Sequence, residues 1–239
     1  MATGSGPDIP DESDVPMRLR RGLVAAAALV TIAALSGCSP ASDSAPSGAA
    51  TATTGAAVDQ TALLGDDPAT LSPSLDAPVT LVEFADYQCP PCGMVSGTMT
   101  DLAEKYPDEL TVVIRNFPLA EIHANATVAA HAAEAARLQG SFPEMYKALF
   151  TGQDEWSDLD QAAAEGVFEG YAEDIGLDVD RFNADRAGDE IATLVDADLA
   201  DGAAVGVAGT PTLFLDGQQL EISSLDELTQ AVESRITLD

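Results

Sequence analysis

The sequence predicts an α/β domain with a central mixed sheet flanked by helices and an inserted all-helical region. Two stretches predict the sheet: PVTLVEFAD over 78–86 and LTVVIRNF over 110–117 are short, apolar and rich in β-branched residues. The Ala-rich stretch from 123 onward has a helical period broken by turn signals. We therefore expect residues 64–239 to form the domain, with the helical insertion at about 118–205.

Local signals predict the remaining elements. Apolar residues recur at near-helical spacing over 90–105, and two prolines fall in the first turn of this helix, where missing N–H groups cost least. Asp216 and Gly217 indicate a hairpin turn between the stretches TPTLFLDG and QQLEI. A capped helix is expected over 224–236. Within the insertion, helices are expected at 125–139, at 141–150 with Ser141 as N-cap, and near 158–175, 178–186 and 188–203.

The composition is strongly acidic. The chain has 239 residues, with 40 Asp and Glu against 10 Lys and Arg, and a formal net charge of −30. No basic patch is available to bind a phosphate backbone, so nucleic acid is not expected as a partner. The acidity fits either a high-salt organism or the codon bias of a GC-rich genome, and the sequence does not separate the two.

The N-terminal region has the pattern of an export signal. Three arginines precede an uncharged stretch from Gly22 to Gly37, which is shorter than the roughly 20 apolar residues of a spanning helix. The stretch ends in LSGC, which resembles the lipobox of bacterial-type lipoproteins. This resemblance implies that residues 1–37 are a signal peptide and that Cys38 carries lipid. An uncleaved short anchor, or simple secretion with a chance cysteine, remains the alternative.

Two details of this region stay open. The acidic residues before Met17 do not suit a signal, so translation could begin at Met17. The stretch RRGLV over 20–24 loosely matches the twin-arginine pattern, which leaves the Sec and twin-arginine routes as alternatives. Residues 38–63 are rich in Ser, Thr, Pro, Gly and Ala, and we expect them to be a disordered tether.

The other two of the three cysteines, Cys89 and Cys92, form a CPPC motif directly after the first predicted strand. A zinc site needs four ligands, and beyond this pair the chain offers only His123 and His131. A permanent disulfide closing so small a loop would stabilise little. A CxxC at a strand-to-helix junction outside the cytoplasm favours a redox centre. His131 is expected in the core or on the surface, and His123 at a helix start, in the core or in the site.

The sequence resembles the thioredoxin fold, and within it the branch of the DsbA disulfide oxidoreductases. The resemblance rests on VEFADYQCPPC, on RNFPL followed by HANATVAAHAAEAARLQGSFPEMYKALF, and on GTPTLFLDG. It covers roughly residues 64–236. The ordered combination is specific, whereas a lone CxxC would not be.

The resemblance implies a role for each matching residue. Cys89 would be the exposed nucleophile, and Cys92 the buried resolving thiol. Pro211 would follow a cis peptide bond, with Thr210 before it offering backbone groups to a substrate. Glu83 matches the buried acid that handles the proton of the second cysteine, and an apolar strand is costly for a carboxylate without such a role. No cofactor beyond the Cys89–Cys92 disulfide is expected.

The chain departs from the family's strongest oxidase between the cysteines, where it has Pro90 and Pro91 in place of Pro-His. A thiolate at a helix N-terminus is stabilised by the helix dipole and unpaired N–H groups. Pro91 adds no positive charge and removes one N–H group. We therefore expect the pKa of Cys89 to lie above the value of about 3.5 in DsbA.

The resulting functional prediction is a lipid-anchored, extracytoplasmic thiol–disulfide oxidoreductase. The favoured activity is disulfide formation in secreted or envelope proteins with cysteine pairs. The family implies reoxidation by a membrane quinone-linked partner, DsbB-like or vitamin-K-epoxide-reductase-like. Two alternatives remain: a reductase of specific envelope disulfides in cytochrome or metal-site maturation, and a non-enzymatic lipoprotein that uses the fold as a binding platform.

Overall fold

The structure is a computed structural model that describes residues 51–52, 58 and 60–238. The predicted signal peptide over 1–37, the alternative start at Met17 and the predicted lipidation site Cys38 lie outside the described residues. Most of the predicted tether does so as well.

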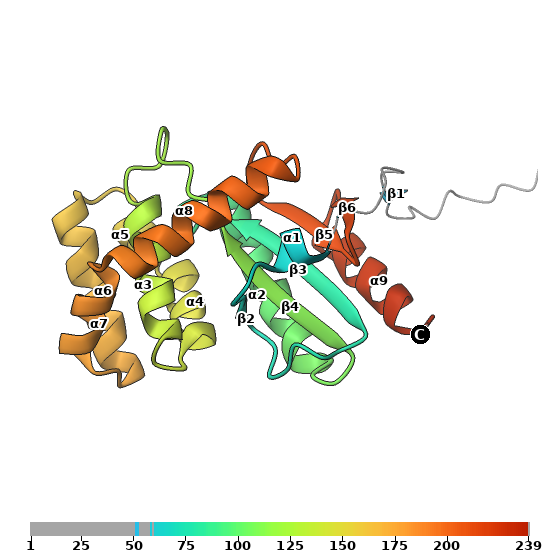
Figure 1. Cartoon of the computed structure of the whole chain (residues 1–239), viewed down its shortest axis with the longest axis horizontal. Helices are drawn as coiled ribbons and strands as arrows, with labels where there is room; N and C mark the ends of the chain where they lie inside the picture. The colour runs from blue at the N-terminus through green and yellow to red at the C-terminus, as the bar shows by residue number, and fades with distance from the viewer. Residues whose placement is uncertain (1–50, 53–57, 59, 239) are drawn as a thin grey trace, which may run out of the picture. The chain divides into compact units, whose positions relative to one another are not determined.

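The central sheet is mixed, as predicted, and has six strands (Figure 1). Its strand order is β1-β6-β5-β3-β4-β2. β3 pairs in parallel with β4, and all other neighbours are antiparallel. The strands are β1 (Thr51–Ala52), β2 (Ala69–Thr70), β3 (Val79–Ala85), β4 (Leu110–Asn116), β5 (Thr212–Leu215) and β6 (Gln218–Glu221).

Helices connect and cover these strands. α2 (Pro90–Lys105) links β3 to β4, and α9 (Leu225–Ile236) follows the β5–β6 hairpin. The helices of the predicted insertion all lie between β4 and β5, and α3 to α7 gather beside the sheet while α8 runs back toward it (Figure 1). They are α3 (Ala126–Arg137), α4 (Phe142–Thr151), α5 (Gln153–Trp156), α6 (Gln161–Ile175), α7 (Val179–Arg186) and α8 (Asp189–Ala204).

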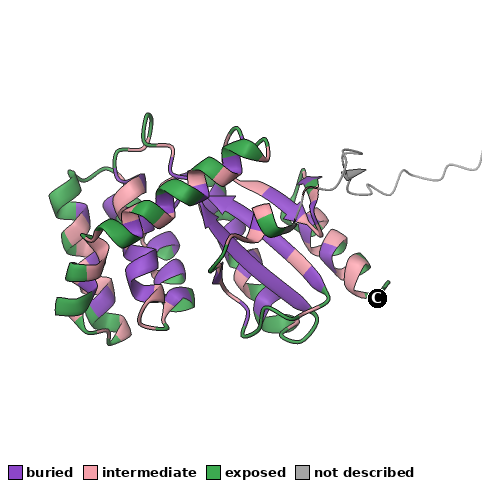
Figure 2. Ribbon diagram, viewed as in Figure 1, coloured by how far each residue is buried: buried purple, intermediate pink, exposed green. Residues whose placement is uncertain are grey.

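The sheet separates two apolar clusters, because successive side chains of a strand point to opposite faces. On β3, Leu81 and Ala85 belong to the larger cluster, which includes buried residues of α2, α3, α4 and α9. Val82 and Phe84 belong to the smaller cluster on the other face. Figure 2 shows the central strands almost entirely buried, with exposed residues on the outer helix surfaces. Glu83 lies between Val82 and Phe84 on β3, so its side chain points to the opposite face, that of the larger cluster.

The structure corrects the predicted extent of the tether over residues 38–63. α1 (Gln60–Leu64) lies at the end of the predicted tether. Its residue Leu63 is 1% exposed and packs in the smaller cluster, so this part of the chain belongs to the folded domain. β1 also falls within the predicted tether and pairs with β6. Ser141 is the N-cap residue of α4, as predicted, although its side chain makes no capping hydrogen bond.

The hairpin that closes the sheet forms as its turn residues predict. Asp216 and Gly217 both have positive φ values, 47° and 79°, as a tight two-residue turn between twisted strands requires. The Asp216 carboxylate accepts a hydrogen bond from the backbone N–H of Thr80 at 2.8 Å, which ties the turn to β3.

None of the helices described over residues 60–238 is long and apolar enough to cross a membrane.

Candidate active site

The CPPC motif lies where β3 gives way to α2. Cys89 is the N-cap residue of α2, and Pro90 and Pro91 occupy its first two positions, as predicted. Both prolines are exposed. Because prolines have no N–H group, the first backbone donor of the helix is that of Cys92.

Both cysteines are free thiols in this structure, and both are buried. Cys92 is 0% exposed, as the resolving role implies. Cys89 is only 5% exposed, so the prediction of an exposed nucleophile is wrong. The loop before β5 contributes to this cover, because the Cys89 thiol donates a hydrogen bond to the carbonyl oxygen of Thr210 at 3.4 Å.

The peptide bond between Thr210 and Pro211 is cis, which confirms the conformation implied for Pro211. Thr210 directs its backbone carbonyl at the sulfur of Cys89. The sequence-distant loop and the CPPC motif therefore meet in one site, as the resemblance implies.

The two thiols have opposite pKa shifts. The hydrogen bond from the Cys92 thiol is the main cause that lowers the pKa of Cys89 to about 6. Burial of Cys89 opposes this shift, whereas the Thr210 side chain and the backbone N–H of Cys92 lower the pKa further. Burial raises the pKa of the Cys92 thiol, and its hydrogen bond to Cys89 and the nearby Glu83 carboxylate add to this effect. Cys89 is thus the thiolate of the pair at neutral pH, while Cys92 holds a proton. The value for Cys89 lies above the roughly 3.5 of DsbA, in the expected direction.

Glu83 is buried at the base of the site, with an exposure of 0%. Its neighbours in register are apolar on both sides, Ile114 on β4 and Leu213 on β5. Burial is the main cause that raises the pKa of Glu83 to about 8, and the charge of Cys89 adds to this effect. Hydrogen bonds from the Tyr146 hydroxyl and the Cys92 thiol lower this pKa. A carboxyl group that titrates near neutral pH beside a buried thiol can exchange a proton with it.

A second buried acid, Asp86, was not singled out from the sequence. Its backbone carbonyl accepts a hydrogen bond from the N–H of Cys89 at 3.0 Å. Its carboxylate accepts hydrogen bonds from the N–H groups of Gln88 and Leu119 at 2.7 and 2.9 Å, and lies 2.7 Å from Nδ1 of His123. His123 therefore joins the site through Asp86 and not as part of a helix. In the sequence, only the position of His123 directly after FPLAEI indicated a place in the site.

Two glutamines bind the catalytic loop to the helical insertion. The Gln153 side chain donates to the carbonyl oxygens of Tyr87 and Cys89, at 2.7 and 3.0 Å. The Gln88 side chain donates to the carbonyl oxygen of Ser157 at 2.8 Å and accepts from the N–H of Asn125 at 2.7 Å. The start of α2 is therefore held between the insertion and the loop of Thr210. No local pattern in the sequence reveals these contacts.

Among the described residues, no group of three or more His, Cys, Asp or Glu side chains is arranged to hold a metal ion. The expectation that the site needs neither metal nor cofactor stays a prediction. His131 lies on α3, in a pocket of about 480 Å³ whose lining includes Glu165 and Arg186. Burial lowers the pKa of His131.

Known proteins share this fold and parts of this sequence. The family model described as Thioredoxin matches residues 73–234. The α-DsbA2 thiol-disulfide exchange protein of Wolbachia pipientis has a TM-score of 0.62 at 20% identity, over 74% of this chain and 91% of its own. A thioredoxin-like oxidoreductase of Silicibacter pomeroyi has a TM-score of 0.62 at 24% identity, over 76% and 99%.

A curated relative has closer sequence similarity over a shorter stretch. The Na⁺/H⁺ antiporter NhaA 1 of Mycolicibacterium gilvum is 40% identical over 148 residues, which is 60% of this chain and 22% of the antiporter. The match thus spans about a fifth of the length of that relative.

Fold and site together define a domain with a CxxC pair at a helix N-terminus opposite a cis-proline loop. The chain belongs to the thioredoxin family, and its fold is that of the DsbA-like thiol-disulfide oxidoreductases.

Proposed function

We propose that this chain is a protein thiol–disulfide oxidoreductase that forms disulfides in secreted or envelope proteins. The observation that carries the proposal is the pair of free thiols at the start of α2, opposite the cis Thr210–Pro211 bond. The pKa values of this pair are split, with that of Cys89 lowered to about 6 and that of Cys92 raised. A stabilised Cys89 thiolate is a good leaving group, and it favours the reduced form of the pair.

The reaction follows from this split. In the oxidised form, a substrate thiolate attacks the sulfur of Cys89 and the Cys89–Cys92 bond breaks. Cys92 leaves and takes up a proton, for which Glu83 is the nearby acid. A second substrate thiolate then attacks the substrate sulfur of the mixed disulfide, and Cys89 leaves as a thiolate. The substrate loses two electrons and the cysteine pair gains them.

The pair must then be reoxidised, and this step sets the direction of net electron flow. A membrane quinone-linked oxidant of the DsbB-like or vitamin-K-epoxide-reductase-like kind would keep it oxidised, since an extracytoplasmic compartment can be held oxidising kinetically. With an electron donor in its place, the same site would serve the alternative reductase. Lipid on Cys38 would hold the domain at the outer face of the cell membrane, where either partner lies.

The curated relatives support a place beside a membrane protein. In the Mycolicibacterium relative, the matching stretch belongs to a chain named as a Na⁺/H⁺ antiporter. The stretch that resembles this chain thus shares its chain with a protein named as a transporter, and we propose that lipid on Cys38 holds this domain at a membrane surface as well. A protein at the membrane surface is then a candidate substrate as well as a candidate redox partner.

The direct test mixes the oxidised full-length protein with reduced, unfolded ribonuclease A and follows substrate disulfides by mass spectrometry. Oxidation should occur with the native protein and be lost in Cys89→Ser. The matched control is Cys38→Ser, which removes a cysteine outside the site and should leave this reaction intact. If the native protein and Cys89→Ser behaved alike, with no substrate oxidation by either, the non-enzymatic binding lipoprotein would be favoured instead.

A further inference from the structure

The buried carboxylate of Glu83 has an unusual set of partners. The Tyr146 hydroxyl donates a hydrogen bond to its Oε2 at 3.3 Å, and its Oε1 has no hydrogen-bond partner among the described residues. Both cross-strand neighbours, Ile114 and Leu213, are apolar. A buried polar atom left without a partner costs free energy and calls for an explanation such as a catalytic role.

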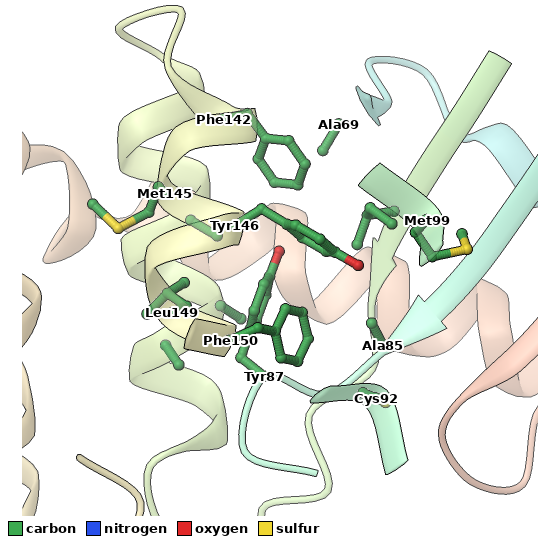
Figure 3. Packing of buried hydrophobic residues seen from close by; sticks show 14 of the residues in the cluster. Ala69, Ala85, Tyr87, Cys92, Met99, Phe142, Met145, Tyr146, Leu149 and Phe150 are labelled. Atoms are coloured by element: carbon green, nitrogen blue, oxygen red, sulfur yellow. The ribbon is translucent and has the colours of Figure 1, made fainter. Parts of the chain in front are cut away.

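Tyr146 reaches Glu83 from a different part of the fold. It lies on α4 in the helical insertion, whereas Glu83 lies on β3 in the sheet. Its ring is 0% exposed and packs against Phe142, Phe150 and Tyr87, with centroid distances of 6.1, 4.9 and 6.1 Å. Figure 3 shows the Tyr146 hydroxyl directed away from α4, toward the side of the cluster where Ala85 and Met99 lie. The packed ring thus fixes the direction of the hydroxyl.

We propose that Tyr146 is a positioning residue that sets the proton exchange between Glu83 and Cys92, so that the helical insertion contributes directly to the redox step. This deepens the proposed function and rests on it. The groups that face Glu83 are Tyr146 from α4, Tyr87 from the loop after β3, and the two cysteines at the start of α2. Among these groups the Tyr146 hydroxyl donates a hydrogen bond to Oε2 of the carboxylate, and the Cys92 thiol also lowers the pKa of Glu83.

The step that depends on this bond is the closure of the pair during reoxidation. Cys89 is then joined to an oxidant sulfur, and Cys92 must lose its proton before it attacks. Glu83 accepts that proton as a carboxylate, the Cys92 thiolate attacks Cys89, and the oxidant sulfur leaves with its electron pair. The reverse proton transfer serves the substrate step described above.

The sign of the effect follows from the chemistry of the hydrogen bond. A hydroxyl that donates to a carboxylate stabilises the charged form, and this bond lowers the pKa of Glu83. Without it, that pKa would rise above about 8, and fewer Glu83 side chains would be ionised at neutral pH. Closure of the pair should then be slower at neutral pH and recover at higher pH.

The test uses the reaction of the reduced full-length protein with an aromatic disulfide whose released thiol is coloured. All variants carry Cys38→Ser, so Cys89 and Cys92 are the only thiols. The first equivalent of coloured thiol reports attack by Cys89, and the second reports closure by Cys92. The rate of the second phase is recorded across the pH range that brackets about 8. The variants are Tyr146→Phe and, as a matched control, Tyr87→Phe.

The control is close, because Tyr87 is buried in the same cluster and its hydroxyl has no hydrogen-bond partner among the described residues. Tyr146→Phe should move the midpoint of the second phase upward by about 0.5 to 1 pH unit and slow it about 3- to 10-fold at neutral pH. Tyr87→Phe should leave the midpoint unchanged. An unchanged midpoint in Tyr146→Phe, or an equal shift in both variants, would overturn the inference.

A second replacement keeps the test decisive if Tyr146→Phe folds poorly. Site-specific incorporation of a fluorotyrosine at position 146 retains the ring and makes the hydroxyl a stronger donor, so the midpoint should move downward. No movement, or an upward one, would overturn the inference. The proposed function fails in a different way, since the protein without a tyrosine change would then release no second equivalent at all.

Discussion

Two buried carboxylates of this protein have opposite surroundings. Asp198 on α8 faces the guanidinium of Arg115, at 2.8 Å from Nε, and also accepts from the backbone N–H and the side-chain amide of Asn116. Glu83 on β3 has a tyrosine hydroxyl at 3.3 Å and no cation as a hydrogen-bond partner among the described residues. The ion pair of Asp198 joins α8 to β4, whereas Glu83, whose pKa is raised to about 8, can gain and lose a proton near neutral pH. The chemical group that pairs with each carboxylate therefore distinguishes the structural acid, Asp198, from the functional acid, Glu83.

Loss of the cation beside Asp198 should give the largest effect on stability. Arg115→Met removes the ion pairs with Asp198 and Asp201 and the hydrogen bond to the carbonyl oxygen of Leu63. A buried charge left without its partner costs about 3–5 kcal/mol, so urea unfolding should show a loss of that order. The pH profile of Cys92 closure should stay unchanged in the folded variant.

The exposed pair of Lys105 and Glu233 offers the matched control for that variant. Lys105→Met removes a cation from a salt bridge in water, where such pairs contribute little. If both variants lost the same small amount of stability, Asp198 would not be a structural acid in the sense proposed here.

Glu83→Gln should have the opposite effect on stability. Burial raises the pKa of Glu83 from its ordinary 4.5 to about 8 in the folded protein. Its contribution to stability is therefore fully present below pH 4.5 and lost as the pH rises through about 8. The amide does not titrate, so the variant should gain relative stability over this window, by a few kcal/mol at about 1.4 kcal/mol per pKa unit.

The same variant should lose activity, because the amide cannot exchange a proton with Cys92. General acid–base contributions suggest a loss of about 100-fold in closure of the pair. Thermal unfolding at several pH values and the two-phase thiol assay measure the two effects on one sample. A variant less stable than the native protein near pH 8 would contradict the distinction between the two acids.

A smaller effect is expected at His123. His123→Ala removes a polar partner from the Asp86 carboxylate, whose charge raises the pKa of Cys89. The pKa of Cys89 should therefore rise above about 6, by about one unit or less. Asp86→Asn removes the charge itself and should lower that pKa. Thiolate absorbance against pH measures both, and shifts of the same sign would refute this assignment.

Gln153→Ala should reduce stability less than Arg115→Met does. It removes two hydrogen bonds to the carbonyl oxygens of Tyr87 and Cys89. A loss of stability of about 1–3 kcal/mol is expected. If the insertion positions α2 as proposed, amide hydrogen exchange should become faster at the start of this helix and stay unchanged in α9.

Local patterns predicted most of the fold. β3 and α2 lie where an apolar run rich in β-branched residues and near-helical spacing predicted them. Cys89, Cys92 and Pro211 meet in one site, as the resemblance implied. The order of a few motifs was enough, because each motif occupies one strand–helix or loop position of the fold. The short elements β2 and α5 carry too few residues for a period to be visible.

The partners within the site could not be predicted in this way. Tyr146 reads as one more apolar residue of a helix, and its ring is indeed in the core. Tyr146 lies 63 residues after Glu83 in the chain. Its hydroxyl meets Glu83 only because α4 packs against α2 beside the sheet. Cys89 was expected to be exposed for a similar reason, since the cover over its sulfur comes from Thr210. Contacts between distant segments depend on the packed structure and leave no local periodicity.

The reduction potential of the Cys89–Cys92 pair, measured in glutathione buffers by mass spectrometry, tests whether the pair acts as an oxidant. A Cys89 pKa of about 6 is about one unit below that of thioredoxin, which corresponds to about 30 mV. We therefore predict a potential between that of thioredoxin, at about −270 mV, and that of DsbA, at about −120 mV. A value at or below that of thioredoxin would contradict an oxidising role and assign the site to reduction.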